Sequence, residues 1–345
     1  MPGVPERIAS RADRIRGEVL ARSGVRFRHY ALDPSTRRQT ETNVSMMEKA
    51  ARAALAEADV DPKTVDLVVT AGPMSDYACP PTSALLQARL GIPSAEELEI
   101  HSNCTGAPKG LLVALDALRI GRRRRALVCY SQLSSAFLRA EYFHGARVSL
   151  DHLALRWMLS DGAGAMLLDG TADPDAGHSV VDAFVESVAA GRAPGMVGGS
   201  AGAFSFEEPV DGLGFYPTMH ASGRHHVGQD ISSVRRHAGA QLVEGLARML
   251  DAVGVAGTRV DHFLLGIPGR HFISDETKAL FREKVGVDSD RVPFDVGEFG
   301  YCGGATMFVQ IDRLRRAGRL GKGEIAAAYL EESSLWMSGG CVLRG

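Results

Sequence analysis

The chain has 345 residues, 45% of them hydrophobic and 23% charged, a balance typical of a globular protein with one large or two medium cores. Its 39 basic and 41 acidic side chains give a formal charge of -2, which excludes a sequence-wide field able to recruit nucleic acid or an anionic membrane. Because no apolar run approaches the roughly 20 residues of a membrane span and the start lacks a signal-peptide core, we expect a cytoplasmic enzyme.

The first half of the chain predicts helices and short strands in alternation. Small and apolar residues at helical spacing predict a helix over residues 45–60, and a β-rich run follows it. A strand then leads into a Gly- and Ala-rich helix, and two more strands follow beyond an insertion. In chain order these elements are the strands 65–69 and 98–102, the helix 106–120, the strand 126–131, the insertion 133–156 and the strand 160–168.

The second half repeats this pattern at an offset of 195 residues, which slips by about one further on. Chance similarity between two α/β stretches is the alternative, but the constant offset over three consecutive elements argues against it. The repeated elements are the helix 240–255, the strand 260–264, the turn 285–287, the strand 292–296, the helix 305–316, and the strands 325–330 and 338–343.

Strands that alternate with helices predict sheets covered on both faces. The repeat divides the chain into an N-terminal half, residues 1–178, and a C-terminal half, residues 179–345. We expect the strand ends of the two halves to meet at a shared crevice, capped by a Gly-rich insertion over residues 187–236.

Cys104 lies on the turn between the strand 98–102 and the helix that follows it. The unpaired amides and the dipole of a helix start favour the thiolate, the reactive form of cysteine, so we predict a nucleophile. The alternative is a buried thiol that acts as a small hydrophobe. The five cysteines are odd in number and contain no CxxC pair, which argues against a disulfide framework or a zinc site.

Three segments resemble those of the β-ketoacyl-ACP synthase III family, in the thiolase superfamily. They are HSNCTG at 101–106, LSDGAGA at 159–165 and GVRFRH at 24–29, and the resemblance runs from about residue 10 to the C-terminus. It implies a thiolase-like fold, in which two duplicated α/β halves form a five-layered αβαβα sandwich. It also implies an acyl-enzyme on Cys104, a homodimer, and acyl-carrier protein or coenzyme A thioesters as substrates, with no further cofactor.

The family's other two catalytic positions are less well matched. Counting back from the end of the helix near residue 285 places the catalytic histidine on His271, whereas counting from the strand places it on Gly266 or Ile267; we favour His271. A neutral imidazole there would serve as the base. The family's asparagine falls on Tyr301.

This replacement bears on the reaction. In decarboxylative condensation the histidine and asparagine together hold the extender carbonyl as an enolate, and losing one preorganised donor costs about 3–4 kcal/mol. Acyl transfer to a hydroxyl, amine or thiol requires only a thiolate, a base and an oxyanion hole, so we favour it. The alternatives are a condensing enzyme that uses malonyl-ACP with Tyr301 in place of asparagine, and a non-catalytic partner subunit of a synthase.

The resemblance also assigns binding positions. The backbone N–H groups of Cys104 and Ser334 would form the oxyanion hole, and Cys79 takes the position at which a partner subunit limits the acyl pocket. Arg22 and Ser274 are assigned to the substrate pocket or its entrance.

Other polar groups are given structural interpretations. The arginine run 122–125 follows a helix, whose dipole favours cations at its end, so we expect no nucleic-acid contact. His220, His225 and His226 lack a carboxylate or thiol at ligand spacing, so no metal site is expected. Asp161 is expected to tie a turn.

Overall fold

The computed structural model describes residues 4–143, 148–173, 177–198, 223 and 225–345. Its first sheet has the strand order β2-β1-β3-β4, and all four strands precede residue 170. β1 runs parallel to both of its neighbours, and β4 runs antiparallel to β3. The strands are β1 (Leu67–Gly72), β2 (Glu96–His101), β3 (Arg125–Gln132) and β4 (Gly162–Asp169).

The second sheet has the order β5-β10-β9-β8, and all its strands follow residue 178. β8 runs parallel to β9, whereas β10 is antiparallel to both of its neighbours. The strands are β5 (Ser179–Ser187), β8 (His262–Leu265), β9 (Ile325–Glu332) and β10 (Met337–Arg344), and a separate two-stranded sheet joins β6 (Met196–Val197) to β7 (Gly228–Gln229).

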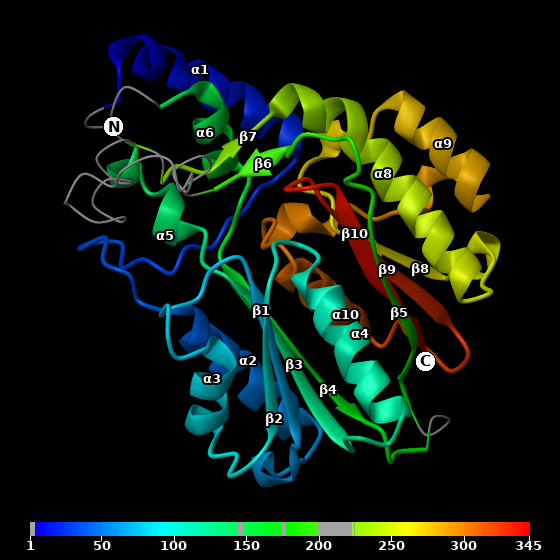
Figure 1. Cartoon of the computed structure of the whole chain (residues 1–345). Coiled ribbons are helices and arrows are strands. Elements are labelled where there is room, and N and C mark those ends of the chain that lie inside the picture. The colour runs from blue at the N-terminus through cyan, green and yellow to red at the C-terminus, as the bar shows by residue number, and fades with distance from the viewer. Residues whose placement is uncertain (1–3, 144–147, 174–176, 199–222, 224) are drawn as a thin grey trace.

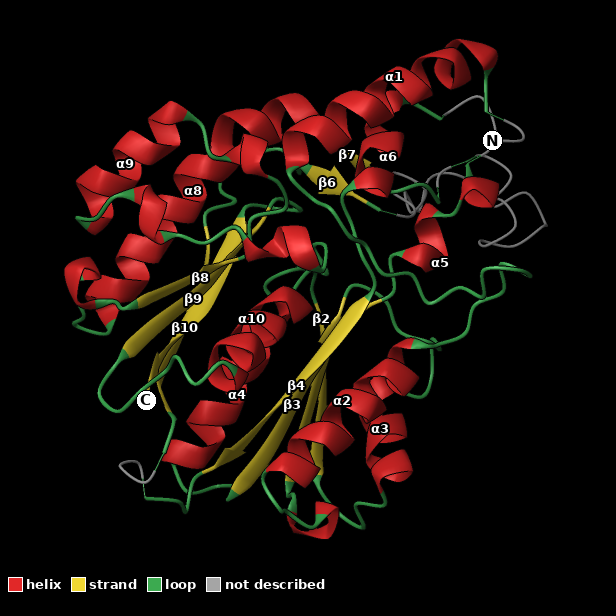
Figure 2. Cartoon of the chain, turned by 180° about the vertical axis from the view of Figure 1, so that it is seen from behind, coloured by secondary structure: helices red, strands yellow, loops and turns green. Residues whose placement is uncertain are grey.

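Two helices, α4 and α10, lie between the sheets, and two more cover the outer face of each sheet (Figures 1 and 2). The layers are therefore helix, sheet, helix, sheet, helix, which is the predicted five-layered arrangement. The central helices are α4 (Gly106–Arg119) and α10 (Ala305–Arg316), with α2 (Asn43–Glu57) and α3 (Thr82–Leu90) on the first sheet and α8 (Ile231–Ala252) and α9 (Asp275–Val285) on the second.

The remaining helices gather at one end of the molecule, the top in Figure 1. α1 (Glu6–Ser23) packs against α6 (Leu150–Ala154), and α5 (Ser135–Leu138) lies nearby in the same insertion. The end of β2, the strand that precedes α4, points toward this end, so the insertion stands over it. No helix of the described segments is long and apolar enough to span a bilayer.

The central layer forms because α4 and α10 present small side chains to the sheets. Ala107 and Ala114 of α4 and Ala305 of α10 are fully buried in one core cluster with residues of both sheets. Gly110 lies so close to β3 that a Cβ would meet Val128 at 2.9 Å. Small residues thus let two sheets approach one helical layer, as close-packed interiors require.

The predicted strand over residues 292–296 does not form. The chain instead makes 3-10 turns at Ser289–Arg291 and Asp295–Glu298. Pro293 has no N–H for a strand ladder, and the Asp295 carboxylate accepts a hydrogen bond from Gln310 at 2.8 Å. β5, which the sequence did not reveal, pairs with β10 and gives the second sheet its fourth strand.

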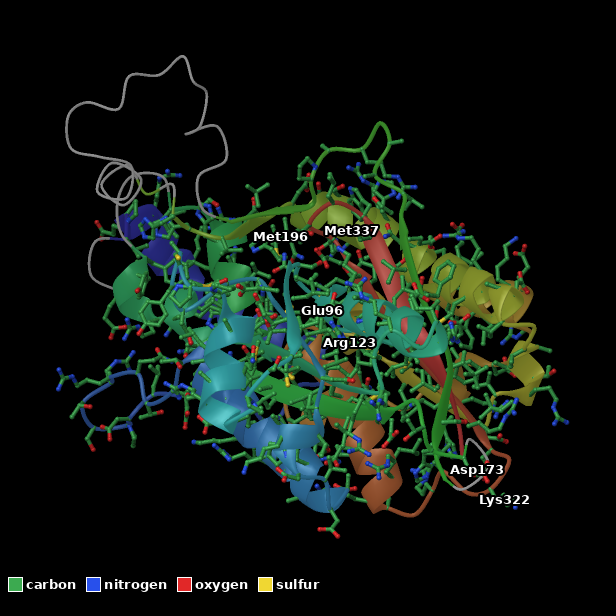
Figure 3. All side chains as sticks on the ribbon, turned by 60° about the horizontal axis from the view of Figure 1, so that its bottom comes forward. Glu96, Arg123, Asp173, Met196, Lys322 and Met337 are labelled. Atoms are coloured by element: carbon green, nitrogen blue, oxygen red, sulfur yellow. The ribbon has the colours of Figure 1, made fainter. Side chains whose placement is uncertain are left out.

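The arginine run 122–125 and Asp161, which were expected to be structural, have partners within the protein. Arg122 and Arg123 both pair with Glu96, which Figure 3 labels beside Arg123. The Asp161 carboxylate accepts backbone N–H bonds from Ala31 and Ser135, each at 2.7 Å, and so ties two distant loops together as expected.

Candidate active site

Cys104 lies three residues past the end of β2 and two before the start of α4. The helix start packs tightly on the sheet, because a Cβ on Gly106 would meet Tyr130 at 3.0 Å and Ala71 at 3.1 Å. The thiol is half-buried and lines a cavity of about 790 Å³. The strand end and close helix packing therefore present the Cys104 thiol to this cavity.

Both halves of the molecule and its insertions line this cavity, mostly with apolar side chains. Met196 of β6 and Met337 of β10, which Figure 3 labels near each other, are two of them. Neither lysine nor arginine occurs among the described residues of the lining, whereas two glutamates do. The other apolar lining residues include Phe137, Leu155, Met158, Leu159, Val227, Leu242, Ile267 and Phe272.

Glu332, at the end of β9, occupies the start of α4. One oxygen of its buried carboxylate accepts the Thr105 N–H at 2.8 Å, the Thr105 hydroxyl at 2.5 Å and the Ser102 hydroxyl at 3.1 Å. The Lys109 ammonium donates to the same Ser102 hydroxyl at 2.9 Å. A carboxylate, rather than the thiol, thus takes the anion-stabilising position at the helix start.

This placement corrects the expectation that the helix start makes Cys104 acidic. Burial raises the pKa of the Cys104 thiol, and the charges of Glu332 and Glu331 raise it further. A hydrogen bond with the Tyr301 phenol acts in the opposite direction, because donation to the sulfur favours the thiolate. The resting group is consequently a neutral thiol.

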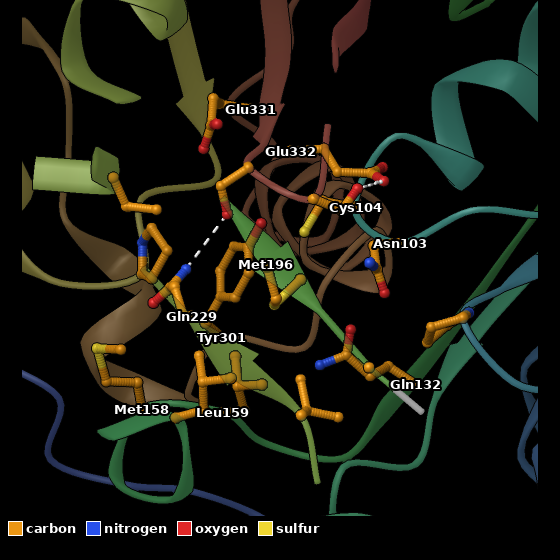
Figure 4. A pocket seen from close by; sticks show the side chains of 18 of the residues that line it. Asn103, Cys104, Gln132, Met158, Leu159, Met196, Gln229, Tyr301, Glu331 and Glu332 are labelled. Carbon is orange, nitrogen blue, oxygen red and sulfur yellow. Dashed lines mark hydrogen bonds between the residues drawn. The ribbon is translucent and has the colours of Figure 1, made fainter. Parts of the chain in front are cut away.

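Tyr301 is buried in the loop before α10, and its hydroxyl is directed at the Cys104 sulfur (Figure 4). Its carbonyl accepts the Ser160 N–H at 2.8 Å, which anchors the loop to the segment before β4. Burial holds the phenol pKa well above 10, so the hydroxyl stays protonated. Of the predicted catalytic residues, Tyr301 and Cys104 are brought into contact.

Glu331, next to Glu332 on β9, has a different environment. Its side chain lines the cavity, and its Oε1 is buried without a hydrogen-bond partner in the described structure. Burial, with the neighbouring Glu332 charge, raises the Glu331 pKa to about 8. A carboxyl that titrates near neutral pH and lacks a partner for one oxygen is suited to exchange a proton with a ligand.

The structure does not bring His271 to the thiol. His271 is exposed in a 3-10 turn, Arg270–Phe272, and lies outside the cavity lining. Gly266, just after β8, lines the cavity instead, and a Cβ there would lie 3.4 Å from the Tyr301 ring. The count from the strand therefore agrees with the geometry, and the position facing Tyr301 carries no side chain.

The assigned binding positions separate into two groups. Ser334 lines the cavity, and its hydroxyl donates to the Glu332 carboxylate; its part in an oxyanion hole remains a prediction. Cys79 is exposed on the loop between β1 and α3, and Arg22 is exposed at the end of α1. Ser274 caps α9 by accepting the Thr277 N–H at 3.2 Å. These last three lie outside the lining of this chain's cavity, and their assignment to the entrance or to a partner subunit's pocket stays a prediction.

The histidines of the insertion contact the backbone. His225 and His226 each interact through Nε2 with the Tyr142 carbonyl, at 3.2 and 2.9 Å, and their rings lie 4.2 Å apart. His220 lies outside the described residues. Within the described part of the chain, no group of three or more histidine, cysteine or carboxylate side chains is arranged to hold a metal ion.

Sequence reasoning missed Glu331 and Glu332. The signal was present, because the apolar strand IAAAYL ends abruptly in two adjacent glutamates. A strand buried on both faces seldom ends in two charges, since burying a carboxylate is costly unless it is paired or functional.

No family model matches the sequence. The β-ketoacyl-[acyl-carrier-protein] synthase III of Bradyrhizobium sp. is 25% identical over 320 residues, which cover 92% of this chain and 87% of the relative. AbyA1, a tetronic acid condensing enzyme, superposes with a TM-score of 0.73 and 25% identity, covering 100% of this chain and 96% of its own. The 3-oxoacyl-(acyl carrier protein) synthase III of Pseudomonas aeruginosa has the same fold, with a TM-score of 0.74, 21% identity, and coverage of 97% and 91%.

These likenesses extend over nearly the whole chain and agree with its duplicated five-layered architecture and with the cysteine at the start of a central helix. The chain is therefore similar to β-ketoacyl-ACP synthase III enzymes in sequence and has the thiolase-like fold.

Proposed function

We propose that this enzyme is an acyltransferase that forms a thioester on Cys104 and passes the acyl group to a heteroatom nucleophile. An acyl-carrier protein or coenzyme A thioester would be the donor, as in the relatives named above, and a small molecule the acceptor. We place the reaction in secondary metabolism, in keeping with the similarity to AbyA1, a tetronic acid condensing enzyme. The main observation that supports this proposal is the cavity lining, in which Cys104 is joined by two glutamates and by no described lysine or arginine.

The charge of the cavity supports heteroatom transfer over malonyl condensation. A malonyl thioester carries a carboxylate, which would enter an apolar cavity already lined by Glu331 and Glu332. Bringing this carboxylate beside that of Glu332, and beside that of Glu331 once it ionises near pH 8, costs several kcal/mol. A neutral or cationic acceptor meets no such repulsion.

The polar groups opposite Cys104 also support it. Gly266 lies where the strand count places the histidine, and Tyr301 stands in place of the asparagine, so one phenolic donor remains to hold an extender carbonyl. Stabilising an enolate requires preorganised donors, whereas transfer to a heteroatom does not form an enolate.

Decarboxylative condensation is the second candidate, because AbyA1 is a condensing enzyme and covers this whole chain. The two candidates differ in product. After acylation with a series of acyl-CoA thioesters from acetyl to decanoyl, addition of malonyl-ACP should leave the adduct intact, whereas a nucleophilic small molecule should discharge it. Release of carbon dioxide with a β-keto product would overturn the proposal in favour of condensation.

The same experiment tests whether the protein is catalytic. Intact mass should show one acyl group on the wild-type chain and none on Cys104→Ala. A wild-type chain that accepts no acyl group from any donor in the series would support the third possibility, a non-catalytic partner subunit.

We further propose a homodimer formed through the free edge of the first sheet. β2 is the edge strand, its Leu98 side chain is 37% exposed, and Ser75 ties the neighbouring loop to Glu99 of the same strand. An open strand edge with an exposed apolar side chain is suited to pairing. Sedimentation should give twice the chain mass, and Leu98→Lys should shift it toward the monomer.

A further inference from the structure

The two cavity glutamates differ in how their charge is satisfied. Glu332 accepts hydrogen bonds from Thr105 and Ser102, and Lys109 reaches the same Ser102 hydroxyl. Glu331 Oε1 has no such donor in the described structure, although it is buried and the side chain faces the cavity. Burying a carboxylate oxygen without a donor is unfavourable, so a ligand that supplies an N–H here would be favoured.

Glu331 lines the same cavity as the reacting sulfur. Its charge raises the pKa of both the Cys104 thiol and the Tyr301 phenol, and all three side chains line one cavity (Figure 4). A molecule bound against Glu331 would therefore lie beside an acyl group carried on Cys104.

The rest of the lining narrows the chemistry of that molecule. Apolar side chains make up most of the wall, and the described lining adds no lysine or arginine that would neutralise Glu331. Such a surface favours a cation with an apolar body over an anion. A carboxylate shielded from water attracts an ammonium group and repels an anion more strongly than it would in bulk solvent.

We propose that the acceptor is an aliphatic amine, whose ammonium group binds Glu331 and gives its proton to that carboxylate before attacking the acyl group on Cys104. This inference rests on the proposed acyl transfer and names its substrate class. Glu331 touches the substrate and is thus a catalytic residue under this proposal.

The proposed reaction conserves atoms and charge. The ammonium transfers one proton to the Glu331 carboxylate and becomes a neutral amine. Its nitrogen then bonds to the acyl carbon while the carbon–sulfur bond breaks, and the proton lost from nitrogen passes to sulfur. An amide leaves, Cys104 returns to the thiol, and Glu331 releases its proton to solvent. With a pKa of about 8, Glu331 holds its proton at neutral pH and becomes the accepting carboxylate as the pH approaches 8, so this proton exchange should operate near and above that pH.

The test uses the full chain, acylated on Cys104 with the best acyl-CoA donor, and follows loss of the adduct by intact mass. n-Hexylamine and 1-hexanol are the paired acceptors, because they match in length and differ in charge. The uncatalysed reaction of the same acyl thioester with each acceptor is subtracted. Glu331→Gln is compared with wild type, and Glu283→Gln on exposed α9 is the control.

We expect hexylamine to discharge the wild-type adduct with formation of the hexyl amide, and hexanol to do so at least tenfold more slowly. Glu331→Gln should still take up the acyl group but lose about 100-fold in the rate of discharge by hexylamine, within the range of general-base catalysis, while discharge by hexanol changes little. Glu283→Gln should match wild type in both reactions.

Three outcomes overturn the inference. Equal discharge by both acceptors would show that the cavity does not select an amine. Equal losses for both acceptors in Glu331→Gln would make this carboxyl a general part of the site, and unchanged rates would remove it from the reaction. A wild-type chain that never acylates instead refutes the proposed function, so the two failures are distinguishable. Circular dichroism establishes that each variant is folded.

Discussion

The two central helices each begin shortly after a cysteine, but the two thiols lie in different surroundings. Before α4, Cys104 is half-buried and opens on the cavity; before α10, Cys302 is 2% exposed and lies within the main core. A Cβ on Gly162 would meet the Cys302 sulfur at 2.8 Å, and the Thr306 hydroxyl lies 3.6 Å from it.

This comparison separates the helix start from what surrounds it. Burial raises the pKa of Cys302 to about 11, and it also raises that of Cys104, so neither helix start yields an acidic thiol. What distinguishes Cys104 is access to a cavity and the presence of Tyr301, Glu331 and Glu332. Duplication repeated the helix start, whereas the unequal loops and strand ends set the two cysteines apart.

The largest effect should come from replacing Cys104, the cysteine that opens on the cavity. Cys104→Ala deletes the only thiol among the described residues of the cavity wall, so turnover should fall by about four orders of magnitude or more. Steady-state acyl transfer and intact mass after exposure to donor measure this. Retention of more than a tenth of the wild-type rate would contradict the role assigned to Cys104.

A second effect concerns Glu331, the cavity carboxyl next to Glu332 on β9. The Glu331 pKa is about 8 in the folded protein and near 4.5 when unfolded, so the folded state retains a proton that the unfolded state has lost between these values. The contribution of Glu331 to stability is therefore most favourable at low pH and is lost as the pH rises through 8, by about 5 kcal/mol.

Glu331→Gln should remove this decrease, so the variant should become more stable than wild type as the pH rises from 5 to 8. Urea unfolding at several pH values measures the difference. Parallel stability curves for the two proteins would show that Glu331 does not carry this proton, and Glu283→Gln provides the matched exposed control.

A third effect tests the Tyr301–Cys104 hydrogen bond. Tyr301→Phe keeps the ring but removes the donor that lowers the thiol pKa, so the thiolate becomes scarcer at a given pH. Acylation should slow by about 10- to 100-fold, within the range for loss of a buried donor to a charged group. The pH profile of iodoacetamide labelling at Cys104 should move to higher pH, whereas exposed Tyr77→Phe leaves it in place.

The smallest effect should come from replacing Cys302, the cysteine that precedes α10. Cys302→Ala removes a buried sulfur from the core and should cost about 1 kcal/mol of stability. Because Cys302 lies outside the cavity lining, the acyl adduct should form as in wild type. A variant that folds but no longer acylates would show that the second helix start takes part in the reaction.

The sequence by itself determined the duplicated architecture. Helical and strand periodicities repeat at a constant spacing, and such local patterns record which faces of each element are buried, so sheets covered by helices followed from them. The turn between a strand and a helix located Cys104, whereas the five-layered order and the position of Tyr301 were implied by the resemblance to synthase III. The strand expected at 292–296 failed where Pro293 interrupts an otherwise suitable run.

The tertiary structure alone decided which groups surround the thiol. His271 and Gly266 are five residues apart in sequence, but the turn after β8 exposes one and places the other against Tyr301. Glu332 reaches Thr105 across 227 positions of the chain, a contact that no local pattern encodes. Proton affinities at this site depend on burial and on charges from distant segments, and both are set only when the two halves pack together.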